Sequence, residues 1–141
     1  MTAEETRNLE AVERWAELYN EDPARMVTEC YAPDCEVVLN TGLRWRGHAP
    51  FLAIEEAVMR SAPRRRGKIS HLIPRNDRVV VQGVLIDPDR GPDWHAPYCA
   101  VLTFMDGLIV KDETYLDPGN WPALDLSAHR LLALGVQLPP R

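Results

Sequence analysis

Asp112 is the residue of this chain that stands out for chemistry, because it is a carboxylate among apolar neighbours on one face of an expected strand. The stretch Trp94–Asp117 predicts two β-strands, since Asp106-Gly107 between two apolar runs is a strong hairpin signal. A three-residue loop with a left-handed glycine would pair Phe104 with Leu108. In that register Asp112 points towards the apolar face.

The three-residue loop is favoured because it separates the side chains of the hairpin cleanly into two faces. The alternative, a two-residue loop, would pair Met105 with Leu108. In the favoured register, the inward face carries Trp94, Ala96, Tyr98, Ala100, Leu102, Phe104, Leu108, Val110, Asp112, Thr114 and Leu116. The outward face carries His95, Thr103, Lys111, Glu113 and Asp117, together with Cys99, Val101, Ile109 and Tyr115.

An inward carboxylate is unfavourable unless it is paired, hydrogen-bonded or protonated, and such groups concentrate at functional sites. Two interpretations of Asp112 therefore remain open. It anchors a buried arginine or caps backbone amides, or it is the general base of an active site.

Two further side chains are candidates for the same chemistry. His71 alternates with Ile69 and Ile73 on a strand expected over 68–74, which places an imidazole on an apolar face. Tyr19 lies near the end of an amphipathic helix expected over 4–20, from which a phenol can reach a cavity. Each is either a packed core residue or a catalytic group.

The elements that would position these groups begin with helices and continue with strands. The first helix has a capping-box signal at Thr2 and Glu5, and Asp22-Pro23 starts a second, short helix. The expected elements after these are a strand over 35–40, an extended segment over 43–46, a helix over 50–61 and strands over 68–74 and 78–86. Gly83, inside an apolar strand, indicates a bulge or a close approach. Arg64-Arg65-Arg66 is interpreted as part of a solvated loop.

This order of elements predicts an α+β fold, because the strands follow the helices instead of alternating with them. A curved antiparallel sheet wrapped around the N-terminal helices would form a cone with an apolar cavity open at one end. The length of 141 residues suits a single domain over 1–141, with a core at about 8–118 and a C-terminal extension over 119–141.

Composition and the motifs that are missing argue against several classes of function. The net charge of −5 argues against a general binder of nucleic acid or anionic membrane, and no apolar run has the length of a membrane span. The N-terminus carries no signal-peptide core, so we expect a cytoplasmic protein. Three cysteines and four scattered histidines show no ligand spacing, and no phosphate loop or dinucleotide fingerprint is present. We expect no metal and no cofactor.

The sequence resembles the SnoaL-like branch of the nuclear-transport-factor-2-like superfamily over roughly residues 8–118. The matching segments are Trp15–Asn20, Tyr31–Val37, Gly47, Phe104–Val110 and Tyr115–Asp117. The resemblance implies the same cone-shaped fold. The superfamily includes ketosteroid isomerases, limonene-epoxide hydrolases, polyketide cyclases, scytalone dehydratases and non-catalytic binders, so the fold does not determine the function.

The sequence departs from two of these enzymes at their catalytic positions. Where ketosteroid isomerases carry a Tyr and two Asp, this chain carries Trp15, Leu39 and Ala100. Where limonene-epoxide hydrolases carry an Asp on the last strand, it carries Thr114. Neither catalytic set is expected here.

The resemblance to scytalone dehydratases is partial. Tyr19 and His71 stand at positions that match their first-helix Tyr and their strand His, whereas Asn20 replaces an Asp and Leu39 replaces a second Tyr. The resemblance thus supports Tyr19 and His71 as catalytic candidates beside Asp112.

Residue pattern and resemblance point to one cavity that binds a small hydrophobic molecule. Its catalytic groups would be Asp112, His71 and Tyr19, and its substrate-binding residues Trp15, Leu39, Trp45, Tyr98, Ala100, Leu102 and Thr114. One hypothesis is a cofactor-independent enzyme that isomerises, dehydrates, cyclises or opens an epoxide by proton transfer. The other is a non-catalytic binder or dimeric scaffold, with a homodimer formed through the outer face of the sheet.

Overall fold

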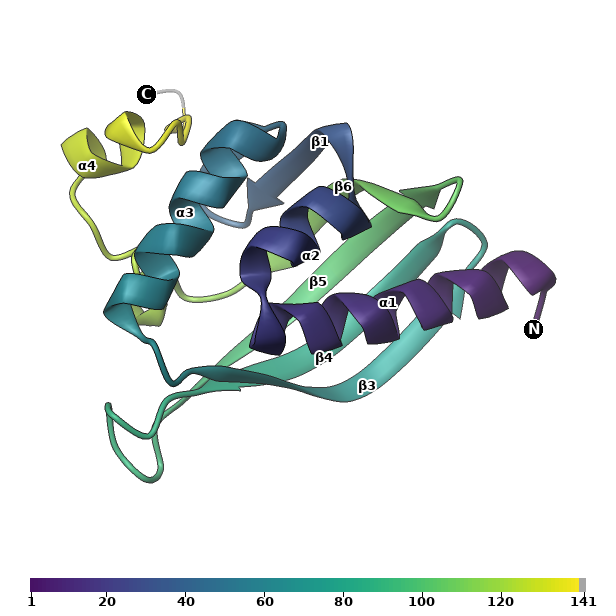
Figure 1. Ribbon diagram of the computed structural model, residues 1–141, viewed down its shortest axis with the longest axis horizontal. Coiled ribbons are helices and arrows are strands. Elements are labelled where there is room, and N and C mark those ends of the chain that lie inside the picture. The colour runs from purple at the N-terminus through teal and green to yellow at the C-terminus, as the bar shows by residue number, and fades with distance from the viewer. Residues whose placement is uncertain (140–141) are drawn as a thin grey trace.

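Helices α1, α2 and α3 lie together against one face of a six-stranded sheet in this computed structural model (Figure 1). The structure describes residues 1–139, so Pro140 and Arg141 lie outside the described residues. The elements are α1 (Ala3–Glu21), α2 (Pro23–Cys30), β1 (Tyr31–Leu39), β2 (Arg44–Arg46), α3 (His48–Ser61), β3 (Arg66–Arg75), β4 (Arg78–Ile86), β5 (His95–Met105), β6 (Leu108–Tyr115), the 3-10 helix η1 (Pro118–Asn120) and α4 (Ala128–Ala133).

The helix starts follow the capping signals in the sequence. Thr2 and Glu5 form the predicted capping box of α1, in which each side chain accepts a hydrogen bond from the other residue's backbone N–H. Asp22 accepts a hydrogen bond from the backbone N–H of Arg25 and caps α2, which begins at Pro23. No helix within residues 1–139 is both long and apolar enough to cross a membrane.

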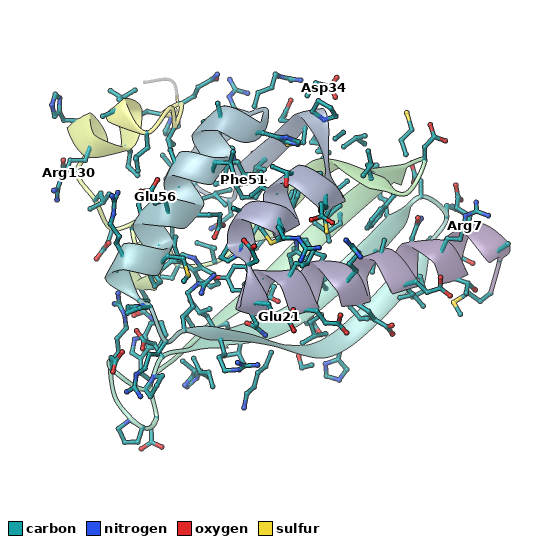
Figure 2. The ribbon with its side chains drawn as sticks, viewed as in Figure 1. Arg7, Glu21, Asp34, Phe51, Glu56 and Arg130 are labelled. Atoms are coloured by element: carbon teal, nitrogen blue, oxygen red, sulfur yellow. The ribbon has the colours of Figure 1, made fainter. Side chains whose placement is uncertain are left out.

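The helices turn apolar residues towards the sheet and charged residues towards solvent. Phe51 of α3 is buried, whereas Glu56 on the same helix is exposed, as are Arg7 and Glu21 on α1 (Figure 2). The apolar faces of α1 and α3 thereby supply one wall of the interior, and the inner face of the sheet supplies the other.

The strand order is β2-β1-β6-β5-β4-β3. Strands β3 to β6 form an antiparallel meander, while β1 runs parallel to β6. The sheet is therefore mixed and does not close on itself. The predicted α+β class and cone-shaped arrangement are confirmed, with the parallel β1–β6 pair as a feature that the sequence pattern did not reveal.

The β5–β6 hairpin has a different register from the predicted one. The turn has two residues, Asp106 with φ 52° and Gly107 with φ 80°, and Met105 pairs with Leu108. The next pairs towards the middle of the hairpin contain Phe104 and then Thr103, and between these two pairs β6 has one extra residue. This bulge changes the alternation of side chains along β6. The predicted three-residue loop is wrong, although the bulge restores the inward direction of residues beyond it.

The bulge determines which β6 side chains reach the interior. Ile109 is fully buried, so its predicted place on the outer face is wrong, whereas Leu108 and Val110 are only half-buried. Beyond the bulge, Asp112 pairs with Leu102 and is buried, as predicted. The inward direction of Asp112 therefore results from two differences from the predicted hairpin that compensate each other: the loop is one residue shorter, and the bulge adds one residue to β6.

A second bulge lies in β3 between Ile69 and His71. Ile69 pairs with Gly83 and points inward, but His71 pairs with the exposed Gln82 and is itself exposed. The alternation that predicted an inward His71 is interrupted at Ser70. The predicted placement of His71 in the cavity is therefore wrong.

Gly83 permits the close approach that the sequence suggested. A Cβ atom at this position would lie 2.6 Å from the Tyr98 hydroxyl and 2.7 Å from the Lys68 carbonyl oxygen. Only a residue without a side chain leaves room for Tyr98 to lie across β4.

We expect Gly83→Ala to destabilise the protein by about 1–3 kcal/mol, because the added methyl overlaps a backbone oxygen that cannot move freely. Urea unfolding at equilibrium measures the change. Gln82→Ala, an exposed neighbour on the same strand, serves as the control. Equal stability of Gly83→Ala and wild type would show that Tyr98 does not occupy this position.

Candidate active site

A cavity of about 100 Å³ lies between the helices and the inner face of the sheet. Eight of the predicted site residues line it: Trp15, Tyr19, Leu39, Trp45, Tyr98, Ala100, Asp112 and Thr114. Aromatic rings supply much of the remaining wall, with Tyr31 packed edge-on against Phe51 at 4.7 Å and Trp45 at 5.6 Å from the same ring.

Two predicted site residues do not contribute to the cavity. His71 is exposed on the outer face of β3, so it does not meet Asp112. Leu102 points inward but is fully buried in the core, outside the cavity lining. An inward direction on a strand therefore did not predict whether a side chain packs in the hydrophobic core or lines the cavity.

Asp112 is the acceptor at the end of a buried chain of hydrogen bonds. Trp15 Nε1 donates to the Tyr31 hydroxyl at 3.1 Å, and that hydroxyl donates to Asp112 Oδ2 at 2.6 Å. Thr114 Oγ1 donates to Asp112 Oδ1 at 2.5 Å. Burial raises the pKa of Asp112, while the hydrogen bonds from Thr114 and Tyr31 lower it. Both oxygens of Asp112 thus have protein partners.

Glu55 on α3 is a second carboxyl group of the cavity, and it was not among the predicted site residues. Its Oε2 atom is buried and has no hydrogen-bond partner among the described residues. The pKa of Glu55 is raised to about 7, chiefly by burial; the positive charge of Arg65 opposes the rise and the negative charge of Asp112 adds to it. A free carboxyl oxygen with this pKa in an apolar site can accept a proton near neutral pH.

The signal for Glu55 was present in the helical pattern. Phe51, Ile54, Glu55 and Val58 have the spacing i, i+3, i+4 and i+7, which places Glu55 on the buried stripe of α3. An acidic residue on such a stripe is as unusual as an acidic residue on the inner face of a strand.

Two hydrogen-bond donors of the cavity also have no protein partner. The Tyr19 hydroxyl and the Trp45 Nε1 atom are buried and unpaired within residues 1–139. Burial raises the pKa of Tyr19 well above its usual value and that of Tyr98 to about 12, so both phenols stay protonated near neutral pH. These groups can donate hydrogen bonds to an oxygen atom of a ligand.

Arg65 supports Tyr19 from behind the cavity. Its side chain is 3% exposed, its Nη2 atom donates to the Tyr19 carbonyl oxygen at 3.0 Å, and its guanidinium lies 4.4 Å from the Tyr19 ring centroid. The interpretation of Arg64-Arg65-Arg66 as a solvated loop is therefore wrong for Arg65. A buried cation near Glu55 also favours the ionised form of that carboxyl group.

The cavity therefore combines a carboxyl group that titrates near neutral pH with unpaired donors in apolar surroundings. This arrangement can move a proton on a bound molecule and stabilise negative charge on its oxygen. Within the described residues no group of three or more His, Cys, Asp or Glu side chains is placed to hold a metal ion.

We expect Glu55→Gln to stabilise the protein relative to wild type as the pH rises. The folded-state pKa of about 7 exceeds the ordinary value of 4.5, so the native state binds more protons between these values and loses stability as Glu55 ionises. The difference between variant and wild type should grow by about 3 kcal/mol from about pH 4 to about pH 8, at ~1.4 kcal/mol per pKa unit.

Urea unfolding across that pH range measures the difference. Glu56→Gln, at the next and exposed position, should give a curve parallel to that of wild type. Parallel curves for Glu55→Gln and wild type would show that Glu55 has an ordinary pKa in the folded state.

Solved structures with the same architecture align with 79–99% of the chain. A proposed SnoaL-like polyketide cyclase from Jannaschia sp. CCS1 is 18% identical, with 99% of this chain and 98% of that chain aligned and a TM-score of 0.73. A proposed ketosteroid isomerase from Kribbella flavida is 16% identical over 79% and 78% of the two chains, with a TM-score of 0.67.

TerC, crystallised with polyporic acid, is 24% identical over 79% of this chain and 92% of its own, with a TM-score of 0.64. At these identities the likeness establishes the fold alone. No curated protein matches the sequence. A sequence model of the SnoaL-like domain matches residues 12–111, which is most of the chain and includes Glu55 and Arg65. The chain therefore belongs to the SnoaL-like domain family.

Proposed function

We propose that this protein is a cofactor-independent enzyme that transfers a proton on a small, hydrophobic, oxygenated molecule. The observation that carries the proposal is the unpaired Glu55 carboxyl group, whose pKa of about 7 lies in the range where a general base works best. Isomerisation, dehydration, cyclisation and epoxide opening all begin with such a transfer.

The groups of the cavity divide the chemistry between them. Glu55 accepts a proton from a carbon or hydroxyl group of the substrate. The Tyr19 hydroxyl and the Trp45 indole N–H donate hydrogen bonds to the substrate oxygen on which negative charge develops. The apolar wall keeps water away, which strengthens these interactions.

Asp112 has a different role in this proposal from the one that the sequence suggested. Because both of its oxygens already accept hydrogen bonds, it holds Tyr31 and Trp15 in place and contributes negative charge near Glu55. Asp112 is thus a positioning residue and Glu55 the catalytic base. Two structurally similar proteins are named as a proposed polyketide cyclase and a proposed ketosteroid isomerase, and both named reactions belong to the same class of chemistry.

The test measures proton abstraction directly. β-Tetralone is a bicyclic ketone with an acidic α-carbon, and NMR in deuterium oxide follows exchange of its α-protons. Wild type should accelerate this exchange, and Glu55→Gln should lower the catalysed rate by about 10²–10⁴-fold, the usual contribution of a general base. The wild-type rate should rise with pH up to about 7 and then level off, because only ionised Glu55 accepts a proton.

Glu56→Gln is the matched control, since it makes the same chemical change on the solvent side of the same helix. Full activity of Glu56→Gln together with loss in Glu55→Gln would support the proposal. Binding of the ketone without accelerated exchange in wild type would instead favour the second candidate, a non-catalytic carrier of hydrophobic molecules.

We also propose that two copies of the chain associate through the outer face of the sheet. Tyr115 on this face is 51% exposed, and Val80, Val84 and Val101 on neighbouring strands are only half-buried. Ile73 pairs with Val80 across β3 and β4, and Val80 pairs with Val101 across β4 and β5, so these three side chains form a continuous apolar strip.

Val101→Lys should convert a dimer to a monomer, because it places a charge within the apolar strip. Light scattering coupled to size-exclusion chromatography measures the mass. Met105→Lys adds the same charge at the exposed hairpin tip and should leave the dimer intact. A monomeric wild type at high concentration would refute the association.

A further inference from the structure

The segment that follows β6 contributes to the wall of the cavity. Trp121 and Leu124 both line the cavity, and Leu124 is buried. The Trp121 ring packs edge-on against the Tyr98 ring, with centroids 5.8 Å apart and planes at 88°. The segment 118–124 thus contacts the inner face of β5 at Tyr98.

Two hydrogen bonds anchor the backbone of this segment. Asp117 Oδ1 accepts a hydrogen bond from the Gly119 N–H, and Leu124 N–H donates to the Trp121 carbonyl oxygen. Between those two anchors Ala123 is buried with φ 69°, a left-handed conformation that alanine rarely adopts. The following residue, Leu124, is buried as well, and backbone strain of this kind is concentrated at functional sites.

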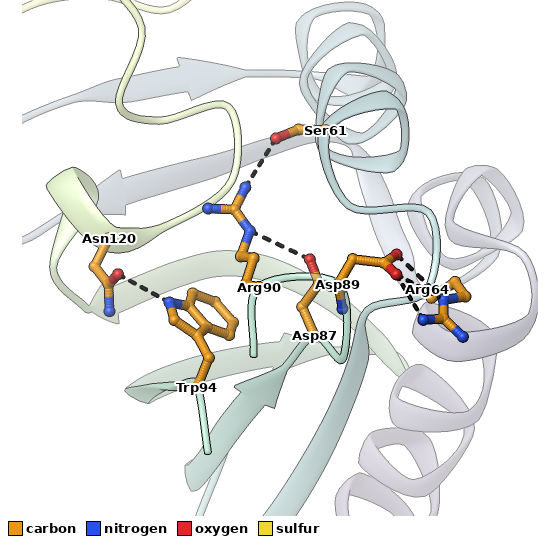
Figure 3. A network of polar contacts seen from close by, with 7 residues as sticks. All are labelled: Ser61, Arg64, Asp87, Asp89, Arg90, Trp94 and Asn120. Atoms are coloured by element: carbon orange, nitrogen blue, oxygen red, sulfur yellow. Dashed lines mark hydrogen bonds and ion pairs between the residues drawn. The ribbon is translucent and has the colours of Figure 1, made fainter. Parts of the chain in front are cut away.

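Polar contacts tie the segment to the two loops beside it (Figure 3). Trp94 Nε1 donates to Asn120 Oδ1 at 3.2 Å, and the Arg90 guanidinium lies 5.3 Å from the Trp94 ring. Arg90 also donates to Ser61 at the end of α3 and to the buried Asp87. The end of α3, the β4–β5 loop and the segment 118–124 are therefore connected in one network.

We propose that Trp121 is a specificity-determining residue that limits how large a ring system the cavity admits. Its ring closes the cavity against Tyr98, and the polar network holds it there. The preferred ligands would be small, flat hydroxylated or keto compounds, while larger fused-ring systems would meet the Trp121 side chain. This inference takes its ligand class from the proposed function, but it concerns size and does not require catalysis.

The first experiment compares Trp121→Ala with Trp121→Phe, which removes the indole but keeps an aromatic ring. Calorimetry measures the dissociation constants of β-naphthol, with two rings, and hydroxypyrene, with four. Trp121→Ala should shift the ratio of the two constants towards hydroxypyrene by about tenfold, a usual size for discrimination by an apolar pocket. Trp121→Phe should stay close to wild type. An equal change for both ligands would overturn the proposal.

A second experiment needs no ligand of the cavity. Both variants retain Trp15, Trp45 and Trp94, of which Trp15 and Trp45 line the cavity. Acrylamide should quench their fluorescence more strongly in Trp121→Ala than in Trp121→Phe, because the wall is open in only one of them. Equal quenching would overturn the proposal.

The two experiments also separate this inference from the proposed function. Failure of both aromatic ligands to bind wild type would count against the ligand class, while the quenching comparison would still decide whether Trp121 closes the cavity. Loss of proton exchange in Glu55→Gln with unchanged quenching would concern catalysis alone.

Discussion

The hydrogen-bonded chain from Trp15 through Tyr31 to Asp112 is the interaction on which the interior depends. It joins α1, the start of β1 and the middle of β6, three elements that are far apart in the sequence. A buried carboxylate without these partners would strongly destabilise the fold. With them, it orients two aromatic side chains and leaves a defined hollow beside them. The parallel pairing of β1 with β6 places Tyr31 opposite Ile109, and from there its hydroxyl reaches Asp112.

The two carboxyl groups of the cavity differ because their surroundings differ. Asp112 has hydroxyl donors for both oxygens, whereas Glu55 Oε2 has none within the described residues. Burial raises the pKa of both groups, but only Glu55 retains an unpaired oxygen for a ligand. In the proposed enzyme, this unpaired oxygen would lower stability and serve reactivity, since a better partner for Glu55 would stabilise the protein and remove its ability to take a proton.

Aromatic side chains determine the shape of the cavity, and a glycine leaves the space that one of them occupies. Gly83 lets Tyr98 lie across β4, and Tyr98 in turn supports Trp121 from the segment after β6. Arg65 supports Tyr19 from the other side. Each of these rings thus rests on a packed neighbour, which fixes the shape of the cavity.

Local sequence signals were enough to predict the main helices and strands, the caps of the first two helices and the α+β class, because capping, turn chemistry and periodicity act over a few residues. Tertiary structure alone decided which chemistry-bearing groups meet. One bulge turns His71 outward, another keeps Asp112 inward after a shorter loop, and the packing of α3 and of the segment after β6 brings Glu55 and Trp121 to the cavity. The physical reason is that a single extra residue in a strand reverses the face of every residue after it, and such a shift depends on the pairing partner and not on the local sequence.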